Sequence, residues 1–399
     1  MGEAHAVEVQ IIDDARDLLA IEAAWWELLG RAVHAQPTMT PAWLSSWWRV
    51  FGDTGGRELR VVAIRAAGGE LVALIPLLRR WVVRDRVFPV ATLELLGSGE
   101  PVEDEICSEL IGAVVAEGRE KIAARAFAEA LSGGDLGAWD ELSLSAMNTA
   151  DPVVPLLAEA LSRRGAAVEV AETEVCPYIA LPSSWDEYLA MLGREKRYFV
   201  RRTLRDLETW AGPGGMALRR AEDRRDLTRG FQILQGLHEE RWGGPGAFRS
   251  ERFRKFHDLV THRLLHERRA SLDLCWLEVR GEPVAVLYNV AHQGHVHFYQ
   301  SGRRRDVPRG VRPGIGLHLM AIQRAITMGQ RTYELLARAD QYKHQISPGS
   351  ERRLVTLSAV APTMRARAVS GARRTARTLV NSAREVTRSC AALGGARGQ

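Results

Sequence analysis

The chain has 399 residues, of which 46% are apolar and 26% are charged, a balance typical of water-soluble globular proteins. Its length exceeds that of one ordinary domain and predicts two, each large enough to bury a core. No apolar run approaches the roughly 20 residues that cross a bilayer. The acidic N-terminal segment also lacks the basic-then-apolar order of a signal peptide. We therefore expect a cytoplasmic protein.

The first part of the chain predicts two helices, a hairpin and a further helix and strand. Residues 59–78, LRVVAIRAAGGELVALIPLL, alternate apolar and polar residues into a Gly-Glu turn and predict a β-hairpin. Residues 155–172 predict a helix, a glycine stop and a strand. Helices are expected around 18–30 and 41–51. Their tryptophans have core-like spacing, with a sugar-binding cleft as the alternative: Trp25, Trp26, Trp43, Trp47 and Trp48.

The same order returns in the second part of the chain. Residues 173–184 contain two prolines and predict a break, and Ser184 with the acids after it forms a helix-cap signature. Residues 272–291, LDLCWLEVRGEPVAVLYNVA, predict a second hairpin with a Gly-Glu turn. Residues 319–336 predict a second helix, glycine stop and strand. Three helices are expected before this hairpin, around 185–210, 226–241 and 251–268.

This repetition predicts an α/β protein built from two tandem, duplicated modules. Each is expected to be a mixed β-sheet flanked by helices, the first at 1–175 and the second at 176–360. Residues 361–399 form an arginine-rich tail with a net charge of +7, which leaves the rest of the chain near −2 although the whole carries +5. The tail is interpreted as solubilising and helical or disordered. The alternative is a helix that binds an acidic surface, nucleic acid or membrane headgroups.

Residues 299–343 contain the pattern with the clearest chemistry. A strand and an arginine-rich loop lead into a Pro-Gly-Ile-Gly turn at 313–316, and an apolar-periodic helix follows. The unpaired N–H groups of a first helical turn, together with the helix dipole, favour an anion. Arg309 and Arg312 adjoin this turn and can pair with phosphate. Because the corresponding first-half segment, 95–110, is acidic, we expect a phosphate-bearing cofactor in the second half only.

Two further patterns suggest sites that we do not favour. Residues 194–208 are strongly basic with interleaved aromatic residues, but an apolar stripe at helical spacing favours a solvated helix face over a nucleic-acid site. An anionic acceptor or tRNA is the alternative ligand of this face. His292, His295 and His297 surround a turn without a nearby acid or cysteine, and we interpret them as a polar hairpin tip. The four cysteines show no metal-ligand spacing, so no metal is predicted.

Several segments together resemble the double-module acyltransferases of the GNAT superfamily, specifically the group named for cellulose-biosynthesis acetyltransferases (CelD/BcsL-like). The chain is also similar to the Fem-type peptidoglycan aminoacyltransferases, which share the doubled fold but take the acyl group from aminoacyl-tRNA. The resemblance covers roughly residues 10–360 and depends on the order and spacing of its parts. These are PAWLSSWWRVFG (41–52), IPLL (75–78), LPSSWDEYLAMLGREKRYFVRRTLRDLE (181–208), LHEERWGGPGAF (237–248), RPGIGLHL (312–319) and YELLARADQYK (333–343).

The resemblance implies two tandem GNAT-like modules, of which the first lacks a phosphate cradle and the second binds acyl-CoA, with acetyl-CoA as the favoured donor. It implies transfer of an acetyl or longer acyl group to an amine, less readily to a hydroxyl, of a sugar, cell-envelope or natural-product precursor. The implied phosphate-binding residues are Arg309, Arg312, Gly314, Ile315, Gly316 and Leu317. Val311 stands where the family usually carries Gln or Arg, and Arg312 is the expected substitute.

Acyl transfer from a thioester to an amine also requires a base and a proton for the leaving thiolate. The resemblance implies His238 or Glu334 as the base, Tyr342 as the proton donor and Lys343 as a partner for a carboxylate or phosphate. The family tends to carry Asp and Gly where this chain has Glu334 and Ala337. The expected acceptor-binding residues are Arg241, Trp242, Tyr299 and Gln300.

Two alternatives to this function are left open. One is a Fem-like aminoacyltransferase that uses charged tRNA, for which the arginine runs would form an electrostatic track. The other is a catalytically silent binding protein of envelope assembly, which the departures at Val311, Glu334 and Ala337 would favour. Nucleic acid is otherwise not expected as a partner, the tail could make peripheral membrane contact, and no oligomeric state is predicted.

Overall fold

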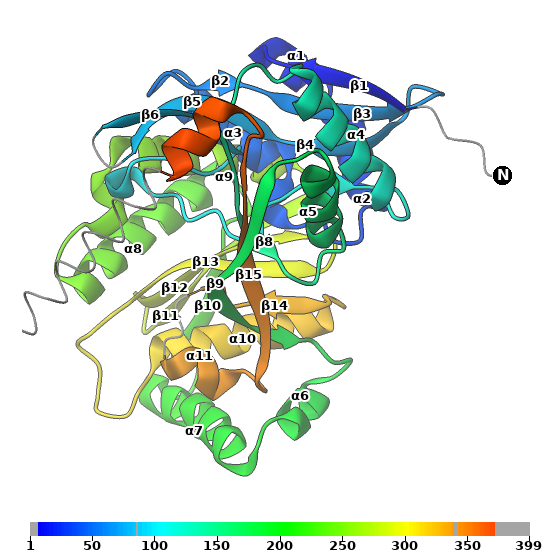
Figure 1. The fold of residues 1–399 in the computed structure, drawn as a ribbon. Coiled ribbons are helices and arrows are strands. Elements are labelled where there is room, and N and C mark those ends of the chain that lie inside the picture. Colours follow the sequence, from blue (N-terminus) through cyan, green and yellow to red (C-terminus); the bar gives the residue numbers. More distant parts are fainter. Residues whose placement is uncertain (1–6, 85–86, 338–340, 372–399) are drawn as a thin grey trace, which may run out of the picture.

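The computed structural model describes residues 7–84, 87–337 and 341–371, with only the backbone of Trp242. In Figure 1 the first half of the chain lies above the second, and long strands run between the two. None of the helices described is long and apolar enough to cross a membrane. The expected mixed α/β fold is confirmed, with sheets flanked by helices in both halves.

The first half contains a small antiparallel sheet, ordered β1-β3-β4-β7 among the described residues, and a second group of strands in a larger sheet. Helices α2 and α4 contact the small sheet. The strands are β1 (Val7–Ile12), β2 (Glu58–Leu59), β3 (Val61–Ala66), β4 (Leu71–Ile75), β5 (Leu77–Arg84), β6 (Phe88–Leu95), β7 (Val114–Val115), β8 (Glu141–Asn148) and β9 (Ala167–Ala180). The helices are α1 (Ala15–Ala20), α2 (Glu22–Arg31), α3 (Pro41–Phe51), α4 (Glu120–Gly133) and α5 (Val153–Arg163).

The second half forms a sheet with helices on both faces. Helices α7 and α10 share one apolar core with the sheet, while α8 and α9 share another core with helices of the first half. The helices are α6 (Trp185–Met191), α7 (Arg194–Ala211), α8 (Arg224–Trp242), α9 (Glu251–His266), α10 (Pro313–Thr327) and α11 (Gln341–Ile346). The strands are β10 (Met216–Arg220), β11 (Ala270–Val279), β12 (Glu282–His292), β13 (His295–Arg303), β14 (Thr332–Glu334) and β15 (Ser350–Val360).

One long sheet joins the halves through an exchange of strands. Its order over the described residues is β10-β11-β12-β13-β14-β9-β15-β8-β6-β5-β2. Strand β9 follows the first half in sequence but lies beside β14 of the second, and β15 follows the second half but lies beside β8 of the first. The break expected at 173–184 therefore lies partly within β9. The two halves form one continuous structure across it.

Both predicted hairpins are present, as β3–β4 and β11–β12. The predicted correspondence between the helices at 155–172 and 319–336 differs from the topology. Helix α10 connects the parallel strands β13 and β14, and its counterpart connecting the parallel strands β6 and β8 is α4, not α5. Local sequence pattern could not distinguish α4 from α5, because both are amphipathic helices that end before a strand.

Strand β13 contains the irregularity that opens the site. Opposite β12, Tyr288 pairs with Gln300 and Asn289 pairs with Phe298, so Tyr299 is an extra residue on β13. Such a bulge bends its strand. Strand β13 then pairs with β14 only through His295–His297. Strand β14 ends there, so β13 continues to Arg303 without it, and this last part of β13 lines a cavity together with the start of α10.

Candidate active site

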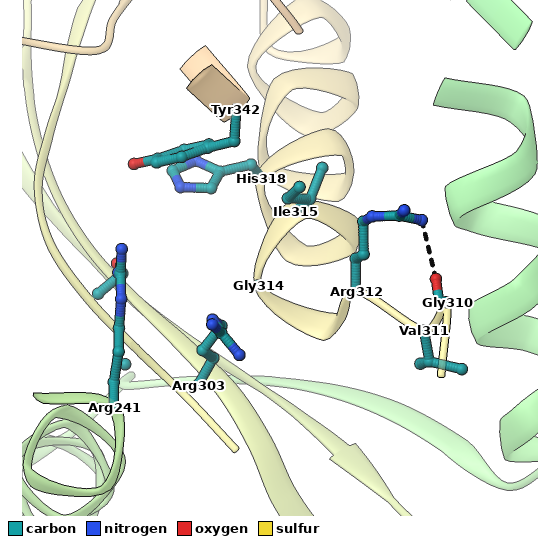
Figure 2. Close-up of a pocket in the computed structure, with 11 residues that line it drawn as sticks. Arg241, Arg303, Gly310, Val311, Arg312, Gly314, Ile315, His318 and Tyr342 are labelled. Carbon is teal, nitrogen blue, oxygen red and sulfur yellow. Dashed lines mark hydrogen bonds between the residues drawn. The ribbon is translucent and has the colours of Figure 1, made fainter. Parts of the chain in front are cut away.

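A cavity of about 410 Å³ lies at the N-terminus of α10 (Figure 2). It is formed by the end of α8, the end of β13, the loop before α10, the first two turns of α10, and α11. Its lining residues are Arg241, Ser301, Gly302, Arg303, Gly310, Val311, Arg312, Gly314, Ile315, His318 and Tyr342. The volume falls within the range of small-molecule sites.

The outer end of the cavity is the start of α10. Pro313 occupies the first helical position, where its missing N–H costs nothing and its fixed φ suits the helix. The first intrahelical bond runs from the Gly316 N–H to the Arg312 carbonyl oxygen at 2.9 Å. The preceding amides, of Gly314 and Ile315, therefore have no intrahelical acceptor and can donate to an anion. This arrangement is the cradle that the sequence predicts.

Only part of the predicted cradle faces the cavity. Gly314 and Ile315 line it, whereas Gly316 and Leu317 are buried and are not among its lining residues. A Cβ on Gly316 would lie 2.5 Å from Cδ2 of Leu207 on α7. The second glycine therefore allows α10 to pack closely against α7, while the first leaves the backbone open to a ligand.

Three arginines surround the helix start. Figure 2 shows Arg241 and Arg303 on one side and Arg312 on the other. Arg303 lies beside Gly314, where an added Cβ would be 3.4 Å from Cδ of the arginine. Although its side chain is exposed, partial desolvation lowers the pKa of Arg303, and the positive charges of Arg241 and Arg305 lower it further. An anion would relieve this repulsion.

Arg303 was not among the predicted phosphate contacts, and Arg312 is less directly placed than predicted. The Arg312 Nη1 donates to the Gly310 carbonyl at 2.8 Å, and its guanidinium lies over the Phe199 ring at 5.2 Å. Arg309 is exposed and is not a lining residue. Arg303 comes from the strand before the loop, so the spacing pattern of the glycine turn did not indicate it.

The inner end of the cavity contains His318 and Tyr342. Their ring centroids are 5.6 Å apart with planes tilted by 35°. His318 is only 2% exposed, and its Nδ1 lies 3.1 Å from the Tyr333 hydroxyl. Burial lowers the pKa of His318 to about 3, and the charges of Lys343 and Arg241 contribute. Tyr342 was predicted at the site. His318 was missed, although it follows Gly314 by four residues and so shares its helix face.

Two predicted catalytic residues have other contacts. Glu334 is fully buried and accepts three hydrogen bonds of 2.9–3.0 Å from Arg352 on β15. The Lys343 Nζ donates to the carbonyl oxygens of Leu336 and Ala337. Neither side chain is among those that line the cavity. Both hold the segment after β14 in place, and their direct participation in chemistry stays a prediction.

Of the predicted residues at the end of α8, Arg241 lines the cavity and His238 lies outside its lining. His238 is buried against the Phe248 ring, and burial lowers its pKa, an effect that Arg241 strengthens. Arg241 lines the cavity and donates to Ser301 Oγ at 3.2 Å.

The Tyr299 hydroxyl donates to the Ile106 carbonyl at 2.6 Å and so ties the two halves together. The Gln300 side chain accepts from the next amide along the strand, that of Ser301. Trp242 ends α8, and its side chain lies outside the described residues.

No group of three or more metal-ligating side chains occurs among the described residues. Of the histidines around residue 295, each has its own partner: the Arg269 carbonyl for His292, Thr332 for His295 and Gln36 for His297. Cys390 and most of the arginine-rich tail lie outside the described residues.

Comparison with known proteins identifies a domain and a fold. Residues 194–344, from α7 to α11, match the family model of the acetyltransferase (GNAT) domain. Over 89% of the chain, the structure is similar to the crystal structure of FemX, with a TM-score of 0.57, 11% identity and 98% of that chain covered. It is also similar over 89% of the chain to a conserved protein of unknown function from Bacteroides thetaiotaomicron VPI-5482, with a TM-score of 0.51, 11% identity and all of that chain covered.

No curated protein matches the sequence. The two structural likenesses establish the fold, since their identities are low. Every residue that lines the cavity lies within the matched segment, and so do strand β13 with its bulge, strand β14 and the start of α10. Residues 194–344 therefore form a GNAT acetyltransferase domain, and the protein is an acyltransferase by this domain.

Proposed function

We propose that the protein transfers an acetyl or longer acyl group from acyl-CoA to an amine, less readily to a hydroxyl. The observation that supports this most is the cavity itself, where a helix start, an exposed arginine and the part of β13 that runs past the end of β14 lie together. The amides of Gly314 and Ile315 and the guanidinium of Arg303 would hold the donor diphosphate. Arg312 would need to leave the Gly310 carbonyl to join them.

The end of β13 would hold the extended arm of the donor. Beyond His297 this strand no longer pairs with β14, so backbone groups along this edge can bind an extended amide-bearing chain. Such a chain would run from the start of α10 toward His318 and Tyr342 at the inner end. The thioester carbonyl would then lie near the two rings.

In the reaction, the amine nitrogen attacks the thioester carbonyl carbon and the carbon–sulfur bond breaks. The amine loses one proton, and the leaving thiolate gains one. Tyr342, whose ring lines the cavity, is the proposed donor to sulfur. Positively charged Arg241 at the same cavity would favour an acceptor with a carboxylate or phosphate group beside its amine. A sugar, cell-envelope or natural-product precursor is the proposed acceptor class, and membership in the cellulose-biosynthesis acetyltransferase group is part of this proposal.

A second candidate is transfer of an aminoacyl group from charged tRNA. Helix α7 presents Arg194, Tyr198, Arg201 and Arg205 at helical spacing, all exposed. Cationic and aromatic side chains on one face are suited to nucleic acid. Helix α7 packs against α10, the helix whose N-terminus forms part of the cavity. A donor of this kind would bind with a steep dependence on salt.

The test is calorimetric titration of the protein with acetyl-CoA at two salt concentrations. Replacing Arg303 with Ala should weaken binding about tenfold or more, because a charge-assisted hydrogen bond contributes about 1.5–3 kcal/mol. Arg268→Ala is the matched control, an exposed arginine that does not line the cavity, and should leave the affinity within about twofold. Absence of binding to acetyl-, malonyl- and long-chain CoA would overturn the CoA proposal, and binding of charged tRNA would then favour the second candidate.

A further inference from the structure

A row of buried polar side chains leads away from the cavity across the second-half sheet. It begins at His318 on α10, whose Nδ1 lies 3.1 Å from the hydroxyl of Tyr333 on β14. The Tyr333 hydroxyl donates to Asn289 Oδ1 on β12 at 3.5 Å, and Asn289 Nδ2 donates to Asp273 Oδ2 on β11 at 3.4 Å. Asp273 ends the row in an ion pair with Arg220 on β10. His318, Tyr333 and Asn289 are each at most 2% exposed.

The carboxylate at the end of this row fixes the direction of every hydrogen bond before it. An ionised Asp273 can only accept, so the Asn289 amide must turn its NH₂ group toward it and its oxygen toward Tyr333. The Tyr333 proton is then directed to Asn289, and the phenolic oxygen is left to accept from His318. This requires the proton of neutral His318 to be on Nδ1. The ring therefore presents an unprotonated Nε2.

Nε2 is the nitrogen available to the cavity. The residue lines the cavity, its Nδ1 is engaged by Tyr333, and the Tyr342 ring covers one face of the imidazole. The opposite tautomer would place an N–H donor at the cavity and leave Tyr333 with two competing acceptors. Because all three residues are buried, water cannot compensate for that mismatch.

We propose that His318 is the proton acceptor for the attacking amine and that Tyr333, Asn289 and Asp273 are positioning residues that fix its tautomer. This inference rests on the proposed acyl transfer. As the amine nitrogen bonds to the thioester carbon, its surplus proton passes to Nε2, and the electron pair of the breaking carbon–sulfur bond leaves on sulfur. Tyr342 gives its proton to that sulfur, and proton exchange between the resulting imidazolium and phenolate restores both side chains. The net change is the acyl group moved from sulfur to the amine nitrogen and one proton moved from the amine to the CoA thiol.

The charges around His318 keep the ring neutral before the reaction. Lys343 on α11 and Arg241 on α8 both oppose its protonation, while Tyr333 on β14 and Tyr342 on α11 are the other titratable groups against it. Burial has the same direction and is the largest cause of the low pKa. The acceptor nitrogen is consequently available throughout the neutral and mildly acidic range. An oxyanion formed at the thioester carbon would favour the imidazolium at the moment when it is needed.

The tautomer can be measured without any substrate. Nitrogen-15 NMR of histidine side chains distinguishes a protonated Nδ1 from a protonated Nε2. In the wild type, His318 should be in the Nδ1–H form and should not titrate between about pH 8 and 5. In Tyr333→Phe, which keeps the ring and removes the hydroxyl, the Nε2–H form should become populated. An Nε2–H form in the wild type would overturn the proposal, as would a form that is unchanged in Tyr333→Phe.

Kinetics tests the consequence of this arrangement, with hydroxylamine as the amine probe and release of CoA thiol from acetyl-CoA as the readout. His318→Ala should lower the turnover number by about 10²–10⁴-fold. Tyr333→Phe should lower it by a smaller factor, on the order of 10- to 100-fold, without changing the acetyl-CoA affinity. His266→Gln at the exposed end of α9 is the control and should match the wild type.

These readouts separate the two proposals. If the wild type does not bind acetyl-CoA, the proposed function fails whatever the NMR result. If it binds and transfers, but His318→Ala retains wild-type turnover, the assignment of His318 is wrong and the function is unaffected. Thermal unfolding of each variant identifies loss of fold, and Tyr333→Phe still tests the proposal should His318→Ala not fold.

Discussion

At the scale of single residues, Glu334 shows that a carboxylate in a suggestive sequence position can already have a buried structural partner. The sequence placed it on the strand after the cradle helix, and the structure agrees. Its partner Arg352 lies on β15, a strand that enters from a distant part of the chain. The local sequence pattern could not indicate that the Glu334 carboxylate is already paired with Arg352. Tyr342 could be located from sequence because only its position in the motif was needed.

Glu334→Gln should therefore destabilise the protein more than it alters chemistry. It leaves the largely buried Arg352 without its counter-charge, which costs about 3–5 kcal/mol in the free energy of unfolding. The double variant Glu334→Leu/Arg352→Met should recover much of that stability and retain thiol release from acetyl-CoA. Chemical unfolding and the same kinetic assay measure both effects. A stable double variant with turnover reduced about 10²-fold or more would show that Glu334 is the base.

At the scale of an element, the two glycines of α10 serve different purposes. The sequence predicted the helix, its proline start and its glycine turn, since these depend on local conformational preferences. It could not separate a glycine that lines the cavity from one needed by a neighbouring helix. That distinction depends on Leu207 of α7, which is more than 100 residues away in sequence and meets α10 only in the fold.

The two glycines are expected to respond oppositely to substitution by alanine. Gly316→Ala forces a methyl group against buried Leu207 and should lower the free energy of unfolding by about 1–3 kcal/mol. Gly314→Ala has room beside Arg303 and should leave stability nearly unchanged, but it places a methyl group at the cradle and should weaken acetyl-CoA binding. Thermal unfolding and calorimetry on both variants test this pairing. Equal effects of the two substitutions on both measurements would contradict it.

At the scale of the whole molecule, the exchange of β9 and β15 is the feature that the sequence could not predict. Both strands are alternating segments at the end of their halves, and nothing in their composition specifies the half whose sheet they join. The halves therefore depend on each other. The acidic 95–110 segment, read from sequence only as a surface that repels phosphate, in fact supports the second half near the site.

Glu109 is the clearest of these supports. Its Oε2 accepts from the Ala337 N–H at 2.6 Å and from Cys176 Sγ at 3.5 Å. Burial raises the pKa of Glu109 above its ordinary value of 4.5, although these donors and Lys343 oppose the rise. The folded state favours the protonated carboxyl. The contribution of Glu109 to the free energy of unfolding is therefore complete below pH 4.5 and is lost as the pH rises through the folded-state pKa.

Glu109→Gln mimics the protonated form and should remove this dependence. Relative to the variant, the wild type should become less stable as the pH is raised from 4.5, and the difference should level off above the folded-state pKa. Chemical unfolding of both proteins across this range measures it. A difference that is constant with pH would show that the pKa of Glu109 does not change on folding, and one that increasingly favours the wild type as the pH rises would show that the carboxylate is the stabilising form; either would contradict the prediction.

The central claim is that the acyl donor binds in the cavity at the start of α10, and a second cavity is the alternative site. A larger cavity of about 760 Å³ lies between α1, α3 and α9, so size alone does not select the site. The direct measurement is backbone hydrogen exchange of the full chain with and without acetyl-CoA. Protection is expected at residues 301–303 and 310–316, with α3 and α9 unchanged. Protection confined to α3 and α9, or no protection anywhere, would contradict the assignment of the α10 cavity as the acyl-donor site.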